Sequence, residues 1–457
     1  MDGADLAFAG LARHADLIAA GEVSSRALTE LYLRRIERLD PLLNAFRVVL
    51  GERALEEAEA ADARRGEGRP LNGVPIAIKD DLHVAGVSTA YGCDADPQPQ
   101  PADSEVVARL RAAGAVILGK THVPEMMATP FTESPTFGVT RNPWDPHRTS
   151  GGSSGGSATA VSAGLCSAAL GSDGAGSVRI PSACCALFGL KPQRGRVPTA
   201  PEVEPHRGMS EYGPLTRHVL DAALLMDAIK DGGPSLADAA RSEPGPLRVA
   251  VSTALPIPGL HPDAEQQHAV ELATRFLREL GHSVETREID YGMTMGNRVL
   301  ARFVRGVGDK ALELDHRERL SRRARGIARI GTSIPTRVTD AAAARAGADA
   351  ARINTIFEHA DVVLTPMFTR RPPRVREFDG RPGWLTLVGM TRLAPYNGTF
   401  NHTGHPAASV PVGFTADGFP LAAQLVGPPD SEARLVSLSA QLERATDWPA
   451  LRPAVAA

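Results

Sequence analysis

The residues best suited to chemistry lie in one stretch of small side chains, residues 150–181. No charged residue occurs in 149–172, where glycine, serine and alanine dominate, so this stretch is neither a bilayer span nor an ordinary apolar helix. It contains two glycine-rich pieces, 151–157 and 171–177. Glycine brings backbone N–H groups close to a ligand, and consecutive N–H groups can converge on an anion. Ser177 ends the second piece, where its hydroxyl would lie beside these donors.

A second reactive group stands at the end of a predicted strand. The apolar run 74–78 leads directly into Lys79, which Asp80 and Asp81 follow. Most lysines are exposed, but this strand would place the amine in or beside the core. Burial lowers the pKa of a lysine toward neutrality, and a neutral lysine is a base.

Two simpler interpretations of the glycine-rich stretch are less favoured. A flexible linker would not be interrupted by a helix-like run, predicted over 158–169, or be followed by the apolar run 183–190. A phosphate cradle would need the Gly-Lys-Ser/Thr ending of a P-loop or the spacing of a dinucleotide fingerprint, and neither occurs here.

Three patterns resemble the amidase signature family of serine hydrolases. They are Gly151-Gly152-Ser153-Ser154-Gly155-Gly156-Ser157, then Gly171-Ser172-Asp173-x-x-Gly176-Ser177-Val178-Arg179-x-Pro181, and upstream Gly73-x-Pro75-x-x-x-Lys79-Asp80. The resemblance covers nearly the whole chain. Among the members of this family, the aryl acylamidases and urethanases are the kind that this chain resembles. It implies that Lys79, Ser153 and Ser177 are the catalytic residues. Ser153, preceded by a cis peptide bond, would bridge the lysine and the nucleophilic Ser177.

The resemblance also implies supporting roles for residues around this triad. The oxyanion hole is expected from the backbone N–H groups of Gly174, Ala175 and Gly176. Orientation of the serines and of the loop is expected from Ser154, Asp173 and Arg179. Arg179 would pair with a carboxylate, although a role in holding an acidic substrate stays open.

An apolar substrate wall is expected from the loop that precedes the first glycine-rich piece. In relatives the equivalent loop borders the acyl pocket, which makes candidates of Met126, Met127, Pro130 and Phe131. Packing of the same side chains in the core is the alternative.

Helical and strand-like segments alternate in a way that predicts an α/β fold. A helix over 105–113 precedes a strand over 115–118, and strands over 247–251 and 283–289 flank another helix. The family fold is a central mixed β-sheet flanked on both faces by α-helices. We expect a single domain over 1–457, with a catalytic core segment in 71–192. Residues 297–351 form a divergent helical insert that is a candidate lid.

Composition excludes several classes of partner. Among 457 residues, 50 Lys+Arg balance 53 Asp+Glu to a net charge of −3, so no overall field favours nucleic acid or an anionic membrane. Acidic residues near the start and the lack of a long apolar run predict a cytoplasmic protein. The four cysteines show no metal-binding spacing. The mechanism that the family resemblance implies needs neither a metal nor an organic cofactor, so none is expected. Both a monomer and a homodimer stay open.

The predicted function is hydrolysis of the C–N bond of a small apolar amide, aryl amide or carbamate through a seryl acyl-enzyme, with side esterase activity. The alternative is the glutamine-hydrolysing subunit of an amidotransferase that works with partner subunits. It is disfavoured because the sequence offers no clear charged pair for the ammonium and carboxylate of an amino acid. An inactive binding protein is a third class, and the complete Lys79, Ser153 and Ser177 set argues against it.

Overall fold

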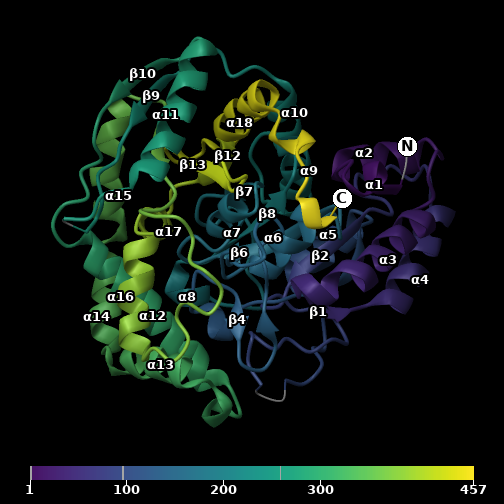
Figure 1. The fold of residues 1–457 in the computed structure, drawn as a ribbon, viewed down its shortest axis with the longest axis horizontal. Coiled ribbons are helices and arrows are strands. Elements are labelled where there is room, and N and C mark those ends of the chain that lie inside the picture. The colour runs from purple at the N-terminus through teal and green to yellow at the C-terminus, as the bar shows by residue number, and fades with distance from the viewer. Residues whose placement is uncertain (1–2, 95–96, 258, 457) are drawn as a thin grey trace.

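An eleven-stranded sheet runs through the computed structural model, which describes residues 3–94, 97–257 and 259–456 (Figure 1). In chain order the strands are β1 (Phe46–Val49), β2 (Pro75–Lys79), β3 (Val116–Thr121), β4 (Glu133–Ser134), β5 (Gly138–Val139), β6 (Ala168–Asp173), β7 (Phe188–Lys191), β8 (Glu211–Thr216), β9 (Arg248–Val251), β10 (Ser283–Thr286), β11 (Val362–Pro366), β12 (Ala407–Phe414) and β13 (Pro420–Val426). Strands β4 and β5 form a separate pair.

The order across the large sheet is β1-β3-β2-β6-β8-β7-β12-β13-β11-β9-β10. Strand β2 runs parallel to both β3 and β6, and β9 runs parallel to both β10 and β11. The remaining neighbours pair antiparallel. The sheet is therefore mixed, which confirms the predicted α/β class.

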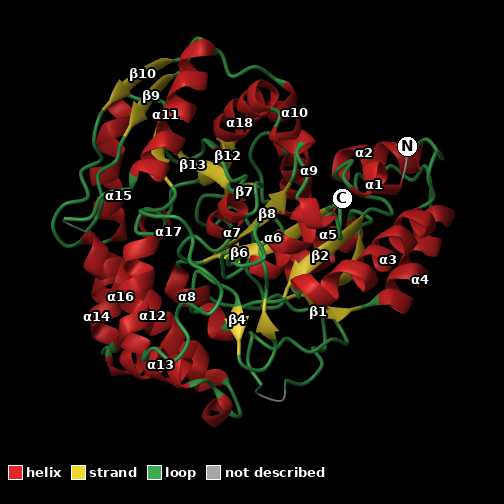
Figure 2. Ribbon diagram, viewed as in Figure 1, coloured by secondary structure: helices red, strands yellow, loops and turns green. Residues whose placement is uncertain are grey.

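Helices surround this sheet (Figure 2). They are α1 (Gly3–Ala7), α2 (Leu11–Ala19), α3 (Ser25–Leu43), α4 (Gly51–Ala63), α5 (Glu105–Ala112), α6 (Gly155–Ser162), α7 (Arg179–Cys184), α8 (Pro205–Gly208), α9 (Val219–Ile229), α10 (Leu236–Arg241), α11 (Ala264–Glu279), α12 (Met295–Glu313), α13 (Arg322–Ser333), α14 (Thr336–Ala344), α15 (Ala346–Asn354), α16 (Gly383–Leu393), α17 (Gly398–Thr403) and α18 (Glu432–Thr446). Helices α6 and α7 contact each other and pack on β6, β7 and β12, while α9 and α18 form another contacting pair on β8 and β12. In the described ranges, no helix combines the length and the apolar character needed to cross a membrane.

The predicted helix over 158–169 is wrong in its second half. Helix α6 ends at Ser162, Gly164 takes a left-handed φ of 63°, and the chain re-enters the sheet as β6. All six residues of β6 are buried between β2 and β8, and a strand covered on both faces has no alternation that would mark it as a strand. The apolar run therefore looked like one helix in the sequence.

Residues 297–351 are mostly helical, as their composition predicts. Helices α12 and α13 pack together and build a second apolar cluster with α16, distinct from the core around the sheet. In Figure 1 these helices lie on one side of the molecule, away from the N-terminal helices α1–α4. These helices thus form a wall beside the sheet.

Candidate active site

The amine of Lys79 lies at the buried carboxyl end of β2. All five residues of this strand are buried, and the Lys79 side chain has no exposed surface. Its Nζ donates to Ser153 Oγ at 2.8 Å and to Ser172 Oγ at 2.6 Å. Burial lowers the pKa of Lys79 below its ordinary value, although the nearby Asp81 carboxylate opposes this shift. The strand therefore delivers an amine that is easier to deprotonate than an exposed lysine.

The peptide bond between Gly152 and Ser153 is cis, which confirms the expectation from the family resemblance. This turn packs tightly against the neighbouring loop. A Cβ on residue 152 would lie 2.6 Å from the carbonyl oxygen of Thr129 and 2.7 Å from the nitrogen of Phe131. Only glycine fits there, and it holds the buried Ser153 hydroxyl beside Lys79.

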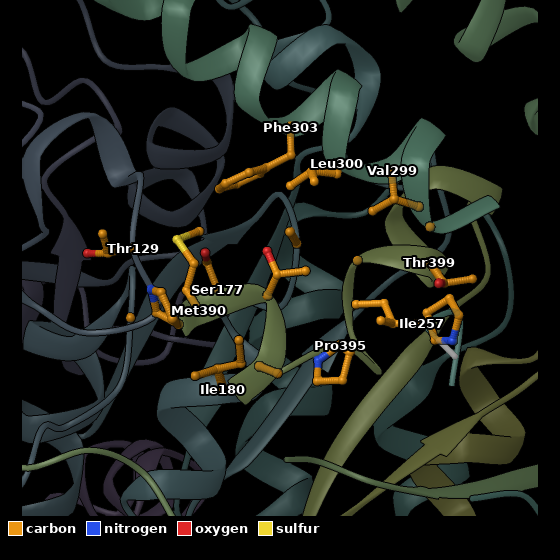
Figure 3. Close-up of a pocket in the computed structure, with 18 of the residues that line it drawn as sticks. Thr129, Ser177, Ile180, Ile257, Val299, Leu300, Phe303, Met390, Pro395 and Thr399 are labelled. Carbon is orange, nitrogen blue, oxygen red and sulfur yellow. The ribbon is translucent and has the colours of Figure 1, made fainter. Parts of the chain in front are cut away.

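Ser177 lies beside this pair and faces a cavity. The N–H of Ser154 donates to the Ser177 carbonyl at 3.2 Å, which joins the two glycine-rich pieces. Ser177 is half-buried and lines the cavity, and Figure 3 shows its side chain among the lining residues. In the described part of the chain no hydrogen bond joins the hydroxyls of Ser153 and Ser177. The structure thus links Lys79 to Ser153 directly and joins Ser177 to Ser154, the residue after Ser153.

The cavity at Ser177 has a volume of about 100 Å³ and an apolar lining. Helix α12 supplies Val299, Leu300 and Phe303, α7 supplies Ile180, and α16 supplies Met390 (Figure 3). None of the described lining residues is charged.

The residues predicted for the substrate wall do not all face the cavity. Met127 and Pro130 line the cavity, whereas Met126 and Phe131 do not. Met126 is fully buried in the apolar cluster with α12 and α13. Phe131 stacks on Phe378 with ring centroids 4.8 Å apart. The loop has no regular period, so the sequence did not show which side chains face inward.

The turn after β6 presents backbone N–H groups beside Ser177. The N–H of Gly176 is not free, because it donates to Asp173 Oδ1 at 2.6 Å. In this structure the Gly176 N–H, one of the three predicted for the oxyanion hole, is therefore occupied by its own chain. The N–H groups of Gly174, Ala175 and Ser177 donate to no other group within the described ranges, so they stay available to a ligand.

Asp173 and Arg179 form a buried ion pair that ties this turn to the end of the sheet. Arg179 donates through Nε to Oδ2 and through Nη2 to Oδ1, each at 2.9 Å. It also donates to Gln424 and Asn401 at 2.6 Å. Burial disfavours ionisation of Asp173, yet Arg179, Lys191 and Asn401 hold the pKa of its carboxyl well below the ordinary value. Arg179 is therefore committed to a carboxylate of its own chain and does not face the cavity.

Two groups beside Lys79 were not identified from the sequence. The Ser172 hydroxyl, which accepts from Lys79, donates to Asp81 Oδ2 at 2.5 Å, and that oxygen lies 3.2 Å from Lys79 Nζ. Ser154 supports the same region, since its hydroxyl donates to the Ser172 carbonyl at 3.3 Å. The position of Asp81, two residues after Lys79 at a strand end, was the available signal.

Comparison with known proteins agrees with this geometry. The sequence matches the Amidase family over residues 27–436. A Mycobacterium tuberculosis protein named "Putative amidase AmiB2" is 49% identical over 462 residues, which cover 100% of each chain. The 6-aminohexanoate-cyclic-dimer hydrolase of Pseudomonas sp. (strain NK87) is 32% identical over 96% of this chain and 95% of that protein.

Solved structures show the same similarity. A 6-aminohexanoate cyclic dimer hydrolase in complex with its substrate superposes with a TM-score of 0.90 at 29% identity, over 99% of this chain and 100% of the other. A bacterial aryl acylamidase of the amidase signature enzymes superposes with a TM-score of 0.84 at 25% identity, over 96% of this chain and 97% of the other. The chain therefore belongs to the amidase signature family of serine hydrolases and is an amide-hydrolysing enzyme that acts on C–N bonds.

Proposed function

We propose that Ser177 is the nucleophile, that Lys79 is the base, and that Ser153 carries the proton between them. The observation that carries this proposal is the 2.8 Å hydrogen bond from the fully buried amine of Lys79 to Ser153, directly beside Ser177. A serine hydroxyl is a weak nucleophile at neutral pH and needs a base within hydrogen-bond reach. A buried amine of lowered pKa supplies one.

The reaction begins when Ser177 turns its hydroxyl toward Ser153, since catalytic hydrogen bonds often close only once the substrate is bound. Neutral Lys79 takes the proton of Ser153 as Ser153 takes that of Ser177, and Ser177 Oγ bonds to the amide carbon. The carbonyl electron pair moves onto oxygen. The proton then returns to the leaving nitrogen, the C–N bond breaks, and the amine departs. Water attacks the acyl-enzyme by the same relay, which releases the acid and restores Ser177.

The oxyanion is held by backbone N–H groups at the turn after β6. Gly174, Ala175 and Ser177 supply the donors, because the N–H of Gly176 is occupied by Asp173. Loss of one such donor typically lowers kcat by about 10²–10³-fold. Ser154, Asp173 and Arg179 act by fixing the two glycine-rich pieces that carry these groups.

The substrate is a small apolar amide, aryl amide or carbamate, and esters are cleaved as a side activity. The apolar, uncharged lining of the 100 Å³ cavity supports this class. An apolar cavity of about 150 Å³ can hold benzene, so the smaller cavity of this protein suits a small acyl group. Helix α12, most of which lies within residues 297–351, supplies four of the described lining residues, which makes this segment a determinant of specificity. The aryl acylamidase among the structural relatives supports the aryl subclass.

Hydrolysis of glutamine with partner subunits is less well supported. Glutamine carries an ammonium and a carboxylate, and burying either charge without a partner is costly. The described lining of the cavity at Ser177 offers no charged side chain to either group.

Turnover of a panel of amides by the purified chain tests the proposal. The panel contains p-nitroacetanilide, hexanamide, phenyl carbamate and glutamine, and amine or ammonia release is measured. We expect turnover of the apolar substrates, a loss of about 10²–10⁴-fold in Lys79→Ala, and no burst of product in Ser177→Ala. Lys230→Ala, in a lysine at the end of α9, is the matched control. Unchanged rates in Lys79→Ala would refute the assignment of Lys79 as the base. Turnover of glutamine but of none of the apolar substrates would refute the proposed substrate class.

A further inference from the structure

A second cavity, of about 290 Å³, lies beside the proposed catalytic lysine and is lined mainly by polar and charged side chains. Met127 lines both this cavity and the apolar one. Asp81, whose Oδ2 lies 3.2 Å from Lys79 Nζ, forms part of its wall. Other walls come from α8, α12 and α14. Both cavities therefore border the catalytic cluster.

Carboxylates outnumber cations around this second cavity, which we name the acidic chamber. Among the described residues that line it, six carboxylate side chains face two cationic ones. The carboxylates are those of Asp81, Glu202, Glu204, Asp309, Glu313 and Asp340, and the cations are Arg207 and Lys310.

Each of the two cations is already neutralised by a pair of carboxylates. Lys310 Nζ lies 3.1 Å from Glu202 and 2.7 Å from Glu313. Arg207 lies 2.9 Å from Asp309 and pairs with Asp340 as well. The carboxylates in excess of these cations leave a net negative charge, and such a charge concentrates cations in the cavity.

The carboxylates of the acidic chamber differ in their exposure to solvent. Glu313 and Asp340 have side chains that are 60% and 62% exposed, whereas Asp81 is 8% exposed. Asp81 Oδ1 is buried and accepts no hydrogen bond within the described residues. An unpaired buried oxygen costs free energy that a donor from a ligand would recover.

A primary ammonium group matches this chamber best. It carries one positive charge and three N–H donors, which suit a carboxylate oxygen that lacks a partner. Anions are repelled by the excess of carboxylates. In the described ranges, no cluster of three or more His, Cys, Asp or Glu side chains is arranged to hold a metal ion. Alkylamines of the lysine type have a pKa near 10.4, so they are charged at neutral pH.

We propose that the acidic chamber binds a primary ammonium group at Asp81. This inference rests on the proposed function, because amide hydrolysis releases an amine beside this chamber. The ammonium belongs either to that released amine or to an amino group that the substrate carries on its leaving side. Both sources share the same chemistry, and the experiments below separate them.

Equilibrium binding to the Ser177→Ala protein tests the chamber without relying on turnover. The probes are pentylammonium and its neutral counterpart 1-pentanol, measured by calorimetry at pH 7.5. We expect pentylammonium to bind at least tenfold more tightly and to lose this advantage in 0.5 M salt. Glu202→Gln/Glu313→Gln in the same background removes two negative charges from around Lys310 and should weaken pentylammonium at least fivefold, while 1-pentanol is unaffected.

Two further variants serve as a control and as a replacement for the double variant. Glu59→Gln, on α4, changes an exposed carboxylate that lines none of these cavities and should have no effect. If the double variant fails to fold, Glu204→Gln replaces it, because no described side chain is bonded to that carboxylate. Equal binding of the amine and the alcohol, or unchanged binding in every chamber variant, would overturn the inference.

Hydrolysis of two matched amides then identifies the source of the ammonium. N-(4-aminobutyl)benzamide and N-pentylbenzamide differ in a terminal charge at nearly equal length. A kcat/KM at least tenfold higher for the cationic amide, reduced in the double variant, assigns the chamber to the substrate. Equal kcat/KM values with inhibition by pentylammonium assign it to the released amine. Equal values without such inhibition contradict both sources. Ammonium binding without turnover of any amide would instead refute the proposed function alone.

Discussion

Asp81 Oδ2 lies 3.2 Å from Lys79 Nζ, and both side chains are buried. The Ser172 hydroxyl joins them, since it accepts from the amine at 2.6 Å and donates to the carboxylate at 2.5 Å. Burial disfavours the ammonium form of Lys79, while the Asp81 carboxylate favours it. The protonation of the proposed base is therefore a balance between these two effects.

Replacement of Asp81 by Asn should shift this balance toward the neutral amine. The carboxylate raises the pKa of Lys79 against the larger lowering by burial, so its removal lowers that pKa further. The base is then active at lower pH, and the acidic limb of the kcat/KM profile should move to lower pH. Values of kcat/KM for p-nitroacetanilide between pH 5 and 9 measure this shift. Asp231→Asn, at a more exposed carboxylate, serves as the control, and an acidic limb that stays in place would contradict the balance.

The sequence predicted the parts of this site that follow from local patterns. The apolar run before Lys79 marked a buried strand, and glycine at 152 fits a turn that a Cβ would obstruct. Contacts between distant segments were not predictable in this way. Asn401 reaches Asp173 across more than two hundred residues, and no period or spacing in the sequence joins them. The contribution of α12 to the cavity wall was not predictable either, because α12 is also far in the sequence from Ser177.

Acid should destabilise the enzyme through Asp173. The pKa of this carboxyl is depressed in the folded protein, so its ionised form stabilises the fold at pH values above the ordinary pKa of 3.8. That stability is lost as the pH falls from 3.8 toward the folded pKa. We expect the midpoint of urea unfolding of the wild type to fall steeply with pH below about 4.

Asp173→Asn isolates this contribution. Breaking a buried ion pair on one side costs about 3–5 kcal/mol, because it leaves the charge of Arg179 without its partner. The variant should unfold at lower urea at pH 7 and show a weaker dependence on acid. Asp173→Asn/Arg179→Met should recover part of the loss, since no charge is then left unpaired. A single variant as stable as the wild type would show that the pair does not stabilise the fold.

A methyl group at residue 152 should disturb both stability and activity. In Gly152→Ala the new Cβ would lie within 2.7 Å of backbone atoms of Thr129 and Phe131, and backbone cannot move aside as a flexible side chain can. Overpacking of this kind costs about 1–3 kcal/mol. Urea unfolding and kcat for p-nitroacetanilide measure the two effects.

Gly347→Ala is the matched control for this substitution. Gly347 lies in α15 with no atom within 4 Å of an added Cβ, so alanine should raise the free energy of unfolding by about 0.5–1 kcal/mol. If both variants changed stability in the same direction, the packing argument at Gly152 would be wrong.

Shortening Val299 should change which acyl groups are accepted. Its side chain on α12 lines the apolar cavity at Ser177, so Val299→Ala enlarges the space next to the nucleophile (Figure 3). One methylene in an apolar pocket is worth about 10-fold or more in discrimination. We expect the ratio of kcat/KM for p-nitrohexananilide to that for p-nitroacetanilide to rise by about this factor. Val388→Ala, at a side chain exposed on α16, removes the same atoms without touching the cavity and should leave the ratio unchanged. A ratio that rises equally in both variants, or in neither, would place the acyl group outside this cavity.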